Sequence, residues 1–406
     1  MPDTIQNDIK SEPATLAIPE PVPRSATRYL QLVLLAAASF AFILFCFELP
    51  ALLGVIDYRT IIGPYHMWWA PNVHDPELLS IHRPGAHQQG AARGGDSSAS
   101  YQIPVAGQTQ FHWDVTYDRH GFRNLRDLQT ADIAMIGDSF VEGLTVSDTE
   151  LGSSRLAQLE GKTVANLGQS TYGPLQEQIV FRRYALPLHP RVVVWMFFEG
   201  NDLEDVIAYR HEIDHPPSFP HAFWARSFTR SVYLAAKRIL HPPVKPAGAL
   251  RAGVFQPTGT TPVTTYFMYQ SKPLSSKELD ALQQTVATLA AVEKLCAARH
   301  MQLVFVFVPT KFRVLHDLCR FPAPSECRTW LPNDMPQRLE DALSTVAPQV
   351  GFLDLTGALV AAASRGDLPY YPDDEHWSPA GHQVAAEAIH RYLSQLGYAN
   401  SETAAR

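Results

Sequence analysis

The sequence has few cysteines and no excess of basic residues, and both shortages exclude broad classes of protein. Four cysteines among 406 residues are too few for a disulfide-based scaffold. Asp and Glu (40) outnumber Lys and Arg (33), so the chain lacks the basic excess that a nucleic-acid-binding surface needs. Hydrophobic residues make up 46% of the chain, which excludes wholesale disorder. The absence of any G-x-S-x-G pattern argues against the nucleophile elbow of the α/β-hydrolases.

One long hydrophobic run lies near the N-terminus. No charged residue interrupts the chain between Arg28 and Glu48, and these 19 residues would span ~28 Å as a helix, close to the thickness of a bilayer's hydrocarbon core. We expect an uncleaved transmembrane helix at residues 29–53. A cleaved signal peptide is the alternative, but apolar residues continue well beyond the small residues of the run. Basic residues precede the run and are scarce after it, which predicts a cytoplasmic tail at 1–28 and an external body.

The rest of the chain divides into a lead-in and an α/β domain. Residues 54–129 form the lead-in, whose glycine-rich part, 84–109, we interpret as a flexible connector. Residues 130–398 alternate between strand and helix patterns, which predicts a parallel sheet covered by helices on both faces. The expected strands are 131–136, 163–167, 191–198, 303–308 and 351–355, and the expected helices are 147–159, 174–184, 275–299, 337–346 and 378–396. Residues 203–270 and 312–335 break this rhythm and are interpreted as insertions, and 399–406 as a C-terminal tail.

Polar residues suited to nucleophilic catalysis follow the expected strands. They lie in the segments Gly137-Asp138-Ser139, Asn166-Leu167-Gly168, Gly200-Asn201-Asp202 and Asp373-Asp374-Glu375-His376. A serine is a weak nucleophile until a neighbouring base takes its proton, and histidine suits that task near neutral pH. Ser139 and His376 are therefore the candidate nucleophile and base, with Asp373 as the carboxylate that orients the imidazole and Asp374 as the alternative. A second Gly-Asp-Ser, at residues 95–97, has no strand before it and is attributed to chance.

The four segments, in this order and each next to its strand or helix, resemble the SGNH (GDSL) hydrolase family over roughly residues 130–396. The resemblance implies a three-layer α/β/α, flavodoxin-like fold and ester hydrolysis or acyl transfer, with no cofactor and no metal. It also implies an oxyanion hole made of the backbone N–H of Ser139, a backbone N–H in 168–173 and the amide of Asn201. Thr171 stands where relatives often have glycine. We favour its N–H for the second position, with Gly173 as the alternative.

Membrane-anchored bacterial relatives suggest where the protein acts and on what. By analogy, the chain would be a single-pass protein of the bacterial inner membrane with a periplasmic catalytic domain, and its substrate an acyl, or acetyl, ester on a cell-surface polysaccharide. Whether the acceptor is water or a sugar hydroxyl stays open. Membrane lipid is the other expected contact, assembly partners in the membrane are unknown, and no nucleic acid is expected. The alternative from another class is a non-catalytic carbohydrate-binding or assembly subunit on the same fold.

Four further features leave alternatives open. His211-Glu212-Ile213-Asp214-His215 matches the H-E-x-x-H pattern of zinc metalloproteases, with His221 as a third ligand, but two prolines after His215 argue against the required helix. Aromatic and basic residues mix over 223–238, which fits a basic amphipathic helix that contacts lipid or packs over the active site. Cys319 and Cys327 are the candidate disulfide pair, with two free thiols as the alternative. Lys311 is interpreted as a solvated surface lysine, with a place in the lining of the pocket as the alternative.

Overall fold

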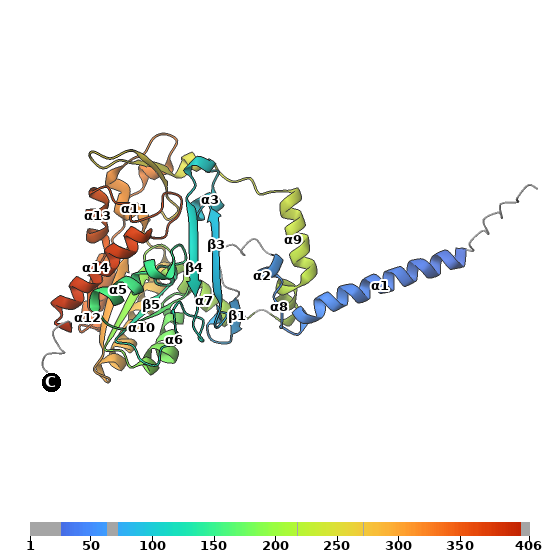
Figure 1. The fold of residues 1–406 in the computed structure, drawn as a ribbon, viewed down its shortest axis with the longest axis horizontal. Coiled ribbons are helices and arrows are strands. Elements are labelled where there is room, and N and C mark those ends of the chain that lie inside the picture. Colours follow the sequence, from blue (N-terminus) through green and yellow to red (C-terminus); the bar gives the residue numbers. More distant parts are fainter. Residues whose placement is uncertain (1–25, 63–71, 217, 271, 399–406) are drawn as a thin grey trace, which may run out of the picture.

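The computed structural model describes residues 26–62, 72–216, 218–270 and 272–398, so residues 1–25 of the expected N-terminal tail (1–28) and the whole expected C-terminal tail (399–406) lie outside the described residues. Figure 1 shows a layered body from which the N-terminal helix α1 (Ala26–Leu52) extends, with α8 (Phe219–Arg226) and α9 (Phe228–Leu240) beside its inner end. The first two strands and two helices of the lead-in are β1 (Asn72–Asp75), β2 (Leu79–His82), α2 (Arg59–Ile62) and α3 (Asp96–Ser100). The body is built around a central parallel sheet.

The central sheet has five strands in the order β12-β10-β7-β5-β6, and all neighbours are parallel. Their bounds are β5 (Ile133–Gly137), β6 (Val164–Gly168), β7 (Val192–Phe198), β10 (Gln302–Val308) and β12 (Gly351–Asp354). In chain order this is the 2-1-3-4-5 arrangement of flavodoxin-like folds. Every residue of β5 and β7 is buried, as expected for parallel strands covered on both faces. The predicted α/β fold and all five predicted strands are confirmed.

Helices cover both faces of this sheet, because side chains along a strand point alternately to opposite sides. Trp195 and Phe197 pack on one face with helices α6, α7, α10 and α12, whereas Val194 and Met196 pack on the other with α4, α5, α13 and α14. The helix bounds are α4 (Ser139–Glu142), α5 (Gly152–Glu160), α6 (Pro174–Val180), α7 (Asp202–Asp214), α10 (Ser276–Ala297), α11 (Lys311–Leu315), α12 (Met335–Val346), α13 (Thr356–Ser364) and α14 (Pro379–Gln395).

The segment interpreted as a flexible connector is ordered, so that interpretation is wrong. Residues 84–109 contain β3 (His87–Arg93), which pairs antiparallel with β4 (Gln110–Thr116), and then α3. The glycine that suggested flexibility here serves packing instead: a Cβ on Gly90 would lie 2.2 Å from the indole of Trp113 on the paired strand. Gly90 therefore allows the close approach of Trp113.

The two segments interpreted as insertions meet in one small sheet. Strands β8 (Ala252–Phe255) and β9 (Val263–Tyr266) come from the first segment and β11 (Cys319–Arg320) from the second, in the antiparallel order β11-β8-β9. The first segment also contains α8 (Phe219–Arg226) and α9 (Phe228–Leu240). The predicted disulfide is wrong, because Cys319 and Cys327 are both free thiols. They pack among apolar side chains as small hydrophobic residues do.

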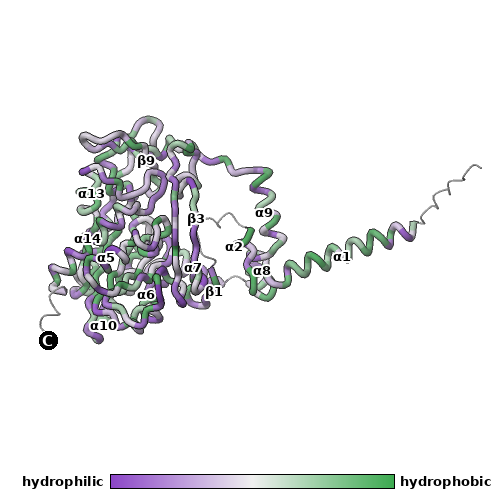
Figure 2. The backbone as a smooth tube through the Cα atoms, in the orientation of Figure 1, coloured by the Kyte–Doolittle hydropathy of each residue, from purple (hydrophilic) through white to green (hydrophobic). Residues whose placement is uncertain are grey.

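Helix α1 is long and apolar enough to cross a membrane, and none of the most apolar stretch is buried inside the protein. Figure 2 shows it as a continuous hydrophobic rod outside the body. A core helix of this composition would be buried, so its exposure agrees with the predicted membrane anchor.

Candidate active site

Ser139 lies at the carboxyl end of the central sheet, where α/β folds place their ligands. It is the first residue of the short helix α4, directly after β5, and Asp138 caps this helix by accepting a hydrogen bond from the N–H of Phe140 at 2.9 Å. Gly168 at the end of β6 allows α4 to come this close, because a Cβ there would lie 2.2 Å from the backbone N of Glu142. The strand-to-helix turn therefore fixes the position of the Ser139 hydroxyl.

The structure brings His376 and Ser139 together across 237 residues of chain. The Nε2 atom of His376 lies 2.9 Å from Ser139 Oγ, and its Nδ1 lies 2.7 Å from Oδ1 of Asp374. Asp374 also accepts a hydrogen bond from the backbone N–H of His376 at 2.8 Å. Hydroxyl, imidazole and carboxylate thus form one continuous line, which is the arrangement needed to deprotonate a serine.

Asp373, the carboxylate that the sequence favoured, is not the one that contacts His376. Its side chain points the other way and accepts hydrogen bonds from the N–H of Gly95 (3.0 Å), the hydroxyl of Ser98 (2.6 Å) and both the N–H and the hydroxyl of Thr109. It is fully buried by these contacts. Asp373 therefore ties the loop of residues 373–376 to the lead-in, and the alternative, Asp374, is the carboxylate that contacts the imidazole.

The second Gly-Asp-Ser segment, attributed to chance, lies beside the site. The N–H of Asp96 donates to Oδ2 of Asp374 at 2.9 Å, and Oδ2 of Asp96 lies 3.3 Å from Nδ1 of His376. A Cβ on Gly95 would lie 2.4 Å from the Asp374 carboxylate. The interpretation of this segment was wrong because its proximity to residues 373–376 depends on long-range packing, which no local pattern indicates.

Two carboxylates set the charge state of His376. Burial alone would lower the pKa of the imidazole, but the negative charges of Asp374 and Asp96 outweigh it and hold the pKa well above its ordinary value. Burial likewise opposes ionisation of Asp374, yet its contacts with His376 keep the pKa of this carboxyl below its usual range. Burial raises the pKa of Asp138, under the serine, to about 6. The two carboxylates therefore stabilise the imidazolium form of His376, which is the form it has after accepting a proton.

Thr171 has the backbone conformation expected of a glycine. Its φ is +68°, in the left-handed region that a branched side chain rarely adopts, and strain of this kind persists where the surroundings impose it. Thr171 lines the same cavity as Ser139 and His376. Gly173 has an ordinary φ of −106° and packs against α7, because a Cβ on it would lie 2.9 Å from the carbonyl oxygen of Asp202. The geometry thus favours Thr171 over Gly173 as the backbone donor.

Asn201 reaches the cavity from the end of β7. It is the residue before α7, and its side-chain nitrogen donates to Oδ2 of Asp205 at 2.9 Å. An amide nitrogen carries two hydrogens, so this contact orients the group and leaves a second N–H for a ligand. Burial, reinforced by the charge of Asp138, raises the pKa of Asp205 to about 7.

Two buried charged residues hold the loops of the site. Glu142 accepts hydrogen bonds from the N–H and the hydroxyl of Ser170, both at 2.6 Å, and so fixes the loop that contains Thr171.

Lys311 is fully buried rather than solvated, contrary to the interpretation from sequence. Its Nζ donates to the carbonyl oxygens of Tyr371 (3.1 Å), Pro372 (3.2 Å) and Asp374 (2.9 Å), so it shapes the loop that carries Asp374 and His376.

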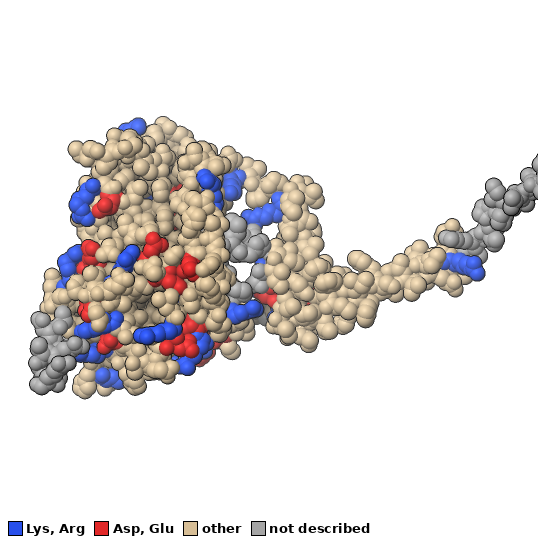
Figure 3. Space-filling model, in the orientation of Figure 1, with Lys and Arg blue, Asp and Glu red and all other residues tan. Residues whose placement is uncertain are grey.

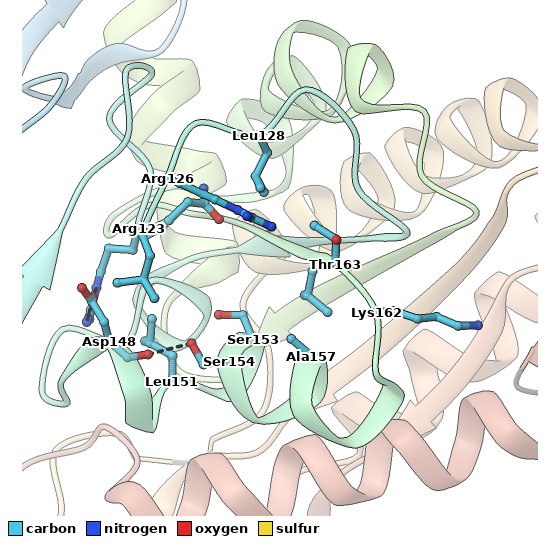
Figure 4. A pocket seen from close by; sticks show the side chains of 13 residues that line it. Arg123, Arg126, Leu128, Asp148, Leu151, Ser153, Ser154, Ala157, Lys162 and Thr163 are labelled. Carbon is cyan, nitrogen blue, oxygen red and sulfur yellow. Dashed lines mark hydrogen bonds and ion pairs between the residues drawn. The ribbon is translucent and has the colours of Figure 1, made fainter.

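A cavity of about 570 Å³ opens above Ser139. Its lining includes the basic residues Arg93, Arg238 and Lys245, from the lead-in and the first insertion. A second cavity, of about 420 Å³ and shown in Figure 4, lies between α5 and residues 123–128 and is lined by none of the residues of the candidate site.

The zinc-protease alternative gains no support from the histidine positions. Within the described residues, one group of three candidate ligand atoms lies within mutual reach, and it consists of Asp96, Asp374 and His376. His211 and His215 stack their rings 4.9 Å apart, and His221 lies 2.7 Å from the hydroxyl of Ser218 instead of joining them. The three histidines are therefore not gathered around one point.

Comparison with known proteins gives a family model and one curated relative. Residues 266–405 match the model described as SGNH hydrolase-like domain, acetyltransferase AlgX. A stretch of 131 residues is 28% identical to the Pseudomonas putida protein described as "Probable alginate O-acetylase AlgJ". That stretch covers 32% of this chain and 32% of the relative, so the match spans about a third of the relative's length.

Solved structures with some likeness to this chain include two carbohydrate esterases. One is an acetyl xylan esterase, which is 10% identical and has a TM-score of 0.33. The alignment includes 63% of this chain and 96% of the esterase. The other is a variant of an acetyl-xylooligosaccharide esterase from Geobacillus, which is 13% identical and has a TM-score of 0.35. The alignment includes 66% of this chain and 95% of the esterase.

Proposed function

We propose that this chain, an SGNH hydrolase-family protein, is a membrane-anchored extracytoplasmic enzyme that transfers acyl groups to or from the hydroxyl groups of a polysaccharide. The observation that carries the proposal is the line of contacts from Ser139 through His376 to Asp374 at the floor of an open cavity. The acetylase and acetyltransferase descriptions of the matched relative and family model support acetyl as the acyl group.

The proposed reaction proceeds through an acyl-serine. The Oγ atom of Ser139 attacks the carbonyl carbon of an acyl ester while Nε2 of His376 takes the hydroxyl proton. The oxyanion that forms accepts hydrogen bonds from the N–H groups of Ser139 and Thr171 and from the amide of Asn201. The intermediate then collapses, the alcohol leaves with the proton from His376, and Ser139 remains acylated.

The second half of the reaction decides between hydrolysis and transfer. His376 takes a proton from water or from a sugar hydroxyl, and the resulting nucleophile attacks the acyl-serine. The bond from the acyl carbon to Ser139 Oγ then breaks, His376 returns the proton to Oγ, and either the free acid or a new ester is released. The cavity lining includes three basic residues, Arg93, Arg238 and Lys245. Their positive charges would attract an acidic polysaccharide. We therefore propose an anionic polysaccharide as the acceptor or as the acylated substrate.

The proposal includes an orientation in the membrane. The N-terminal tail would lie in the cytoplasm, α1 would cross the bacterial inner membrane, and the α/β body would lie in the periplasm. The basic residues before the hydrophobic run support this orientation.

Hydrolysis of p-nitrophenyl acetate by the purified full chain tests the activity. We expect release of nitrophenol that falls at least ~10³-fold in Ser139→Ala, because the acyl-serine can no longer form. Ser364→Ala, at an exposed serine at the end of α13, is the matched control and should keep the full rate. Equal rates in the Ser139→Ala and unchanged proteins would contradict the proposal and leave the carbohydrate-binding alternative.

A further inference from the structure

Helices α8 and α9 are fixed to the end of α1 by reciprocal capping. The carboxylate of Glu48 accepts hydrogen bonds from the N–H groups of Phe228 (3.2 Å) and Thr229 (2.7 Å) at the start of α9. In the other direction, Nε of Arg226 donates to the carbonyl oxygen of Ala51 at 2.5 Å. An acid at a helix start and a cation at a helix end both complement the helix dipoles. The rings of Phe47 and Phe228 stack 4.8 Å apart beside these contacts.

The position of Glu48 sets the depth of α9 relative to a bilayer. The 19 uncharged residues between Arg28 and Glu48 span ~28 Å as a helix, which matches the hydrocarbon core. If α1 crosses the membrane, Glu48 then lies where hydrocarbon gives way to head groups. Because Glu48 binds the first N–H groups of α9, that helix begins at the same depth. Figure 1 shows α9 running across the direction of α1 rather than continuing it.

Helix α9 has one apolar face, and part of that face packs against α1. At 100° per residue, Phe228, Val232, Ala235 and Ile239 fall on one side. Phe228 packs against α1, but further along this face the side chain of Ile239 is 80% exposed. Other large apolar side chains nearby are exposed as well, namely Phe219, Trp224, Leu240 and Val244. This surface has no cover in the described protein, and it is continuous with the apolar surface of α1.

One residue of α9, Arg238, reaches the catalytic cavity. Arg230 and Lys237 lie away from the apolar face, and Arg238 lines the cavity above Ser139. Figure 3 shows basic side chains on the side of this region that faces the body, whereas the side continuous with α1 has an uncharged surface. After α9, Lys245 Nζ donates to the carbonyl oxygen of Ser98 at 2.7 Å, next to the site. Helix α9 therefore connects the end of α1 with the wall of the cavity.

We propose that α9, together with the exposed aromatic residues of α8, lies in the head-group layer of the bilayer that α1 spans. Its apolar face enters the acyl-chain boundary, as amphipathic interfacial helices do, and its polar side forms the membrane-facing wall of the Ser139 cavity. The catalytic cavity is thereby held at the membrane surface rather than free on a tether. This inference rests on the membrane anchoring in the proposed function but not on catalysis.

Spin-label accessibility in the full-length chain, reconstituted in phosphatidylcholine and phosphatidylglycerol vesicles, tests the inference. Cysteines are introduced one at a time, as Ile239→Cys or Val232→Cys, in a chain carrying Cys46→Ser and Cys319→Ser. Lys237→Cys is the matched control on the polar side of α9, and Asp317→Cys, whose native side chain is 89% exposed, is the aqueous control. Phe40→Cys in α1 reports on the membrane span. Each label is measured against oxygen, which concentrates in lipid, and against a water-soluble nickel chelate.

We expect the ratio of oxygen to nickel accessibility at positions 232 and 239 to exceed that at 237 and 317 by at least several-fold and to lie below that at 40. A ratio at 239 equal to that at 317, with position 40 in lipid, would overturn the inference while leaving the anchor intact. Low accessibility of 239 to both reagents would indicate a second copy of the chain on this face and would also overturn it. An aqueous label at position 40 would overturn the anchor itself. Since no step requires turnover, failure of the proposed catalysis is separable from each of these results.

Discussion

Replacing Asp374 by asparagine is the change that best distinguishes the role of Asp374 from that of its neighbour Asp373. Asp374 Oδ1 lies 2.7 Å from Nδ1 of His376, and its side chain is 4% exposed. Removing a unit charge ~4 Å from the imidazolium that forms during catalysis costs about 4 kcal/mol at an effective dielectric constant of ~20. Since ~1.4 kcal/mol is a factor of ten in rate, this alone predicts a loss of about 10³-fold in kcat/KM. Loss of the correct imidazole tautomer would increase the loss in kcat/KM toward ~10⁴-fold.

The matched variant is Asp373→Asn, one residue away. Asp373 accepts hydrogen bonds from Gly95, Ser98 and Thr109 but does not contact His376, so its replacement should lower the free energy of unfolding by at least about 2 kcal/mol. The activity per folded molecule should stay within about tenfold of the unchanged protein. The assay is kcat/KM for p-nitrophenyl acetate between pH 5 and 9, with the folded fraction measured by denaturant unfolding. A larger loss per folded molecule in Asp373→Asn than in Asp374→Asn would refute the assignment.

The remaining predictions concern the residues around this pair. Asp96→Asn removes a negative charge that raises the pKa of His376, so the acid limb of the pH–rate profile should move to lower pH; a shift to higher pH would contradict the reasoning. Thr171→Gly should keep activity within a few-fold and change the free energy of unfolding by less than about 1 kcal/mol, because relief at φ +68° offsets the entropy of glycine. Calorimetry and kinetics check this, and a large loss of activity would show that the threonine side chain is needed. Lys311→Met removes the buried Nζ that donates to the carbonyl oxygens of Tyr371, Pro372 and Asp374, which should lower unfolding stability by about 1–3 kcal/mol and reduce kcat; unchanged kcat would mean that the loop keeps its shape without Lys311.

The central sheet and most of the layers could be predicted from the sequence. Strand β7 consists of seven consecutive apolar residues, and such runs are typical of parallel strands buried on both faces. Helices α10 and α14 begin directly after their N-cap residues, Ser275 and Ser378, whose hydroxyls accept hydrogen bonds from backbone N–H groups. These signals are local, so each is visible in a short stretch of sequence.

What the sequence could not show depends on long-range contacts. Two adjacent acids, Asp373 and Asp374, have the same local pattern, and which of them meets His376 depends on the start of α3, where the N-cap residue Gly95 lies 278 positions from Asp373. The polar, glycine-containing segment 87–93 resembles a loop because its strand is stabilised by pairing with β4 rather than by its own apolar residues. The burial of Lys311 follows from three carbonyl oxygens that only the folded loop brings together.

Covalent labelling by an activated phosphonate ester, located by peptide mass spectrometry on the full chain, tests the central claim most directly. The assembled hydroxyl, imidazole and carboxylate predict one stoichiometric adduct on Ser139, much slower labelling in His376→Ala and in Asp374→Asn, and a rate near that of the unchanged protein in Asp373→Asn. A chain that stays unlabelled, or that carries its adduct on another residue while Ser139 remains free, would contradict the account.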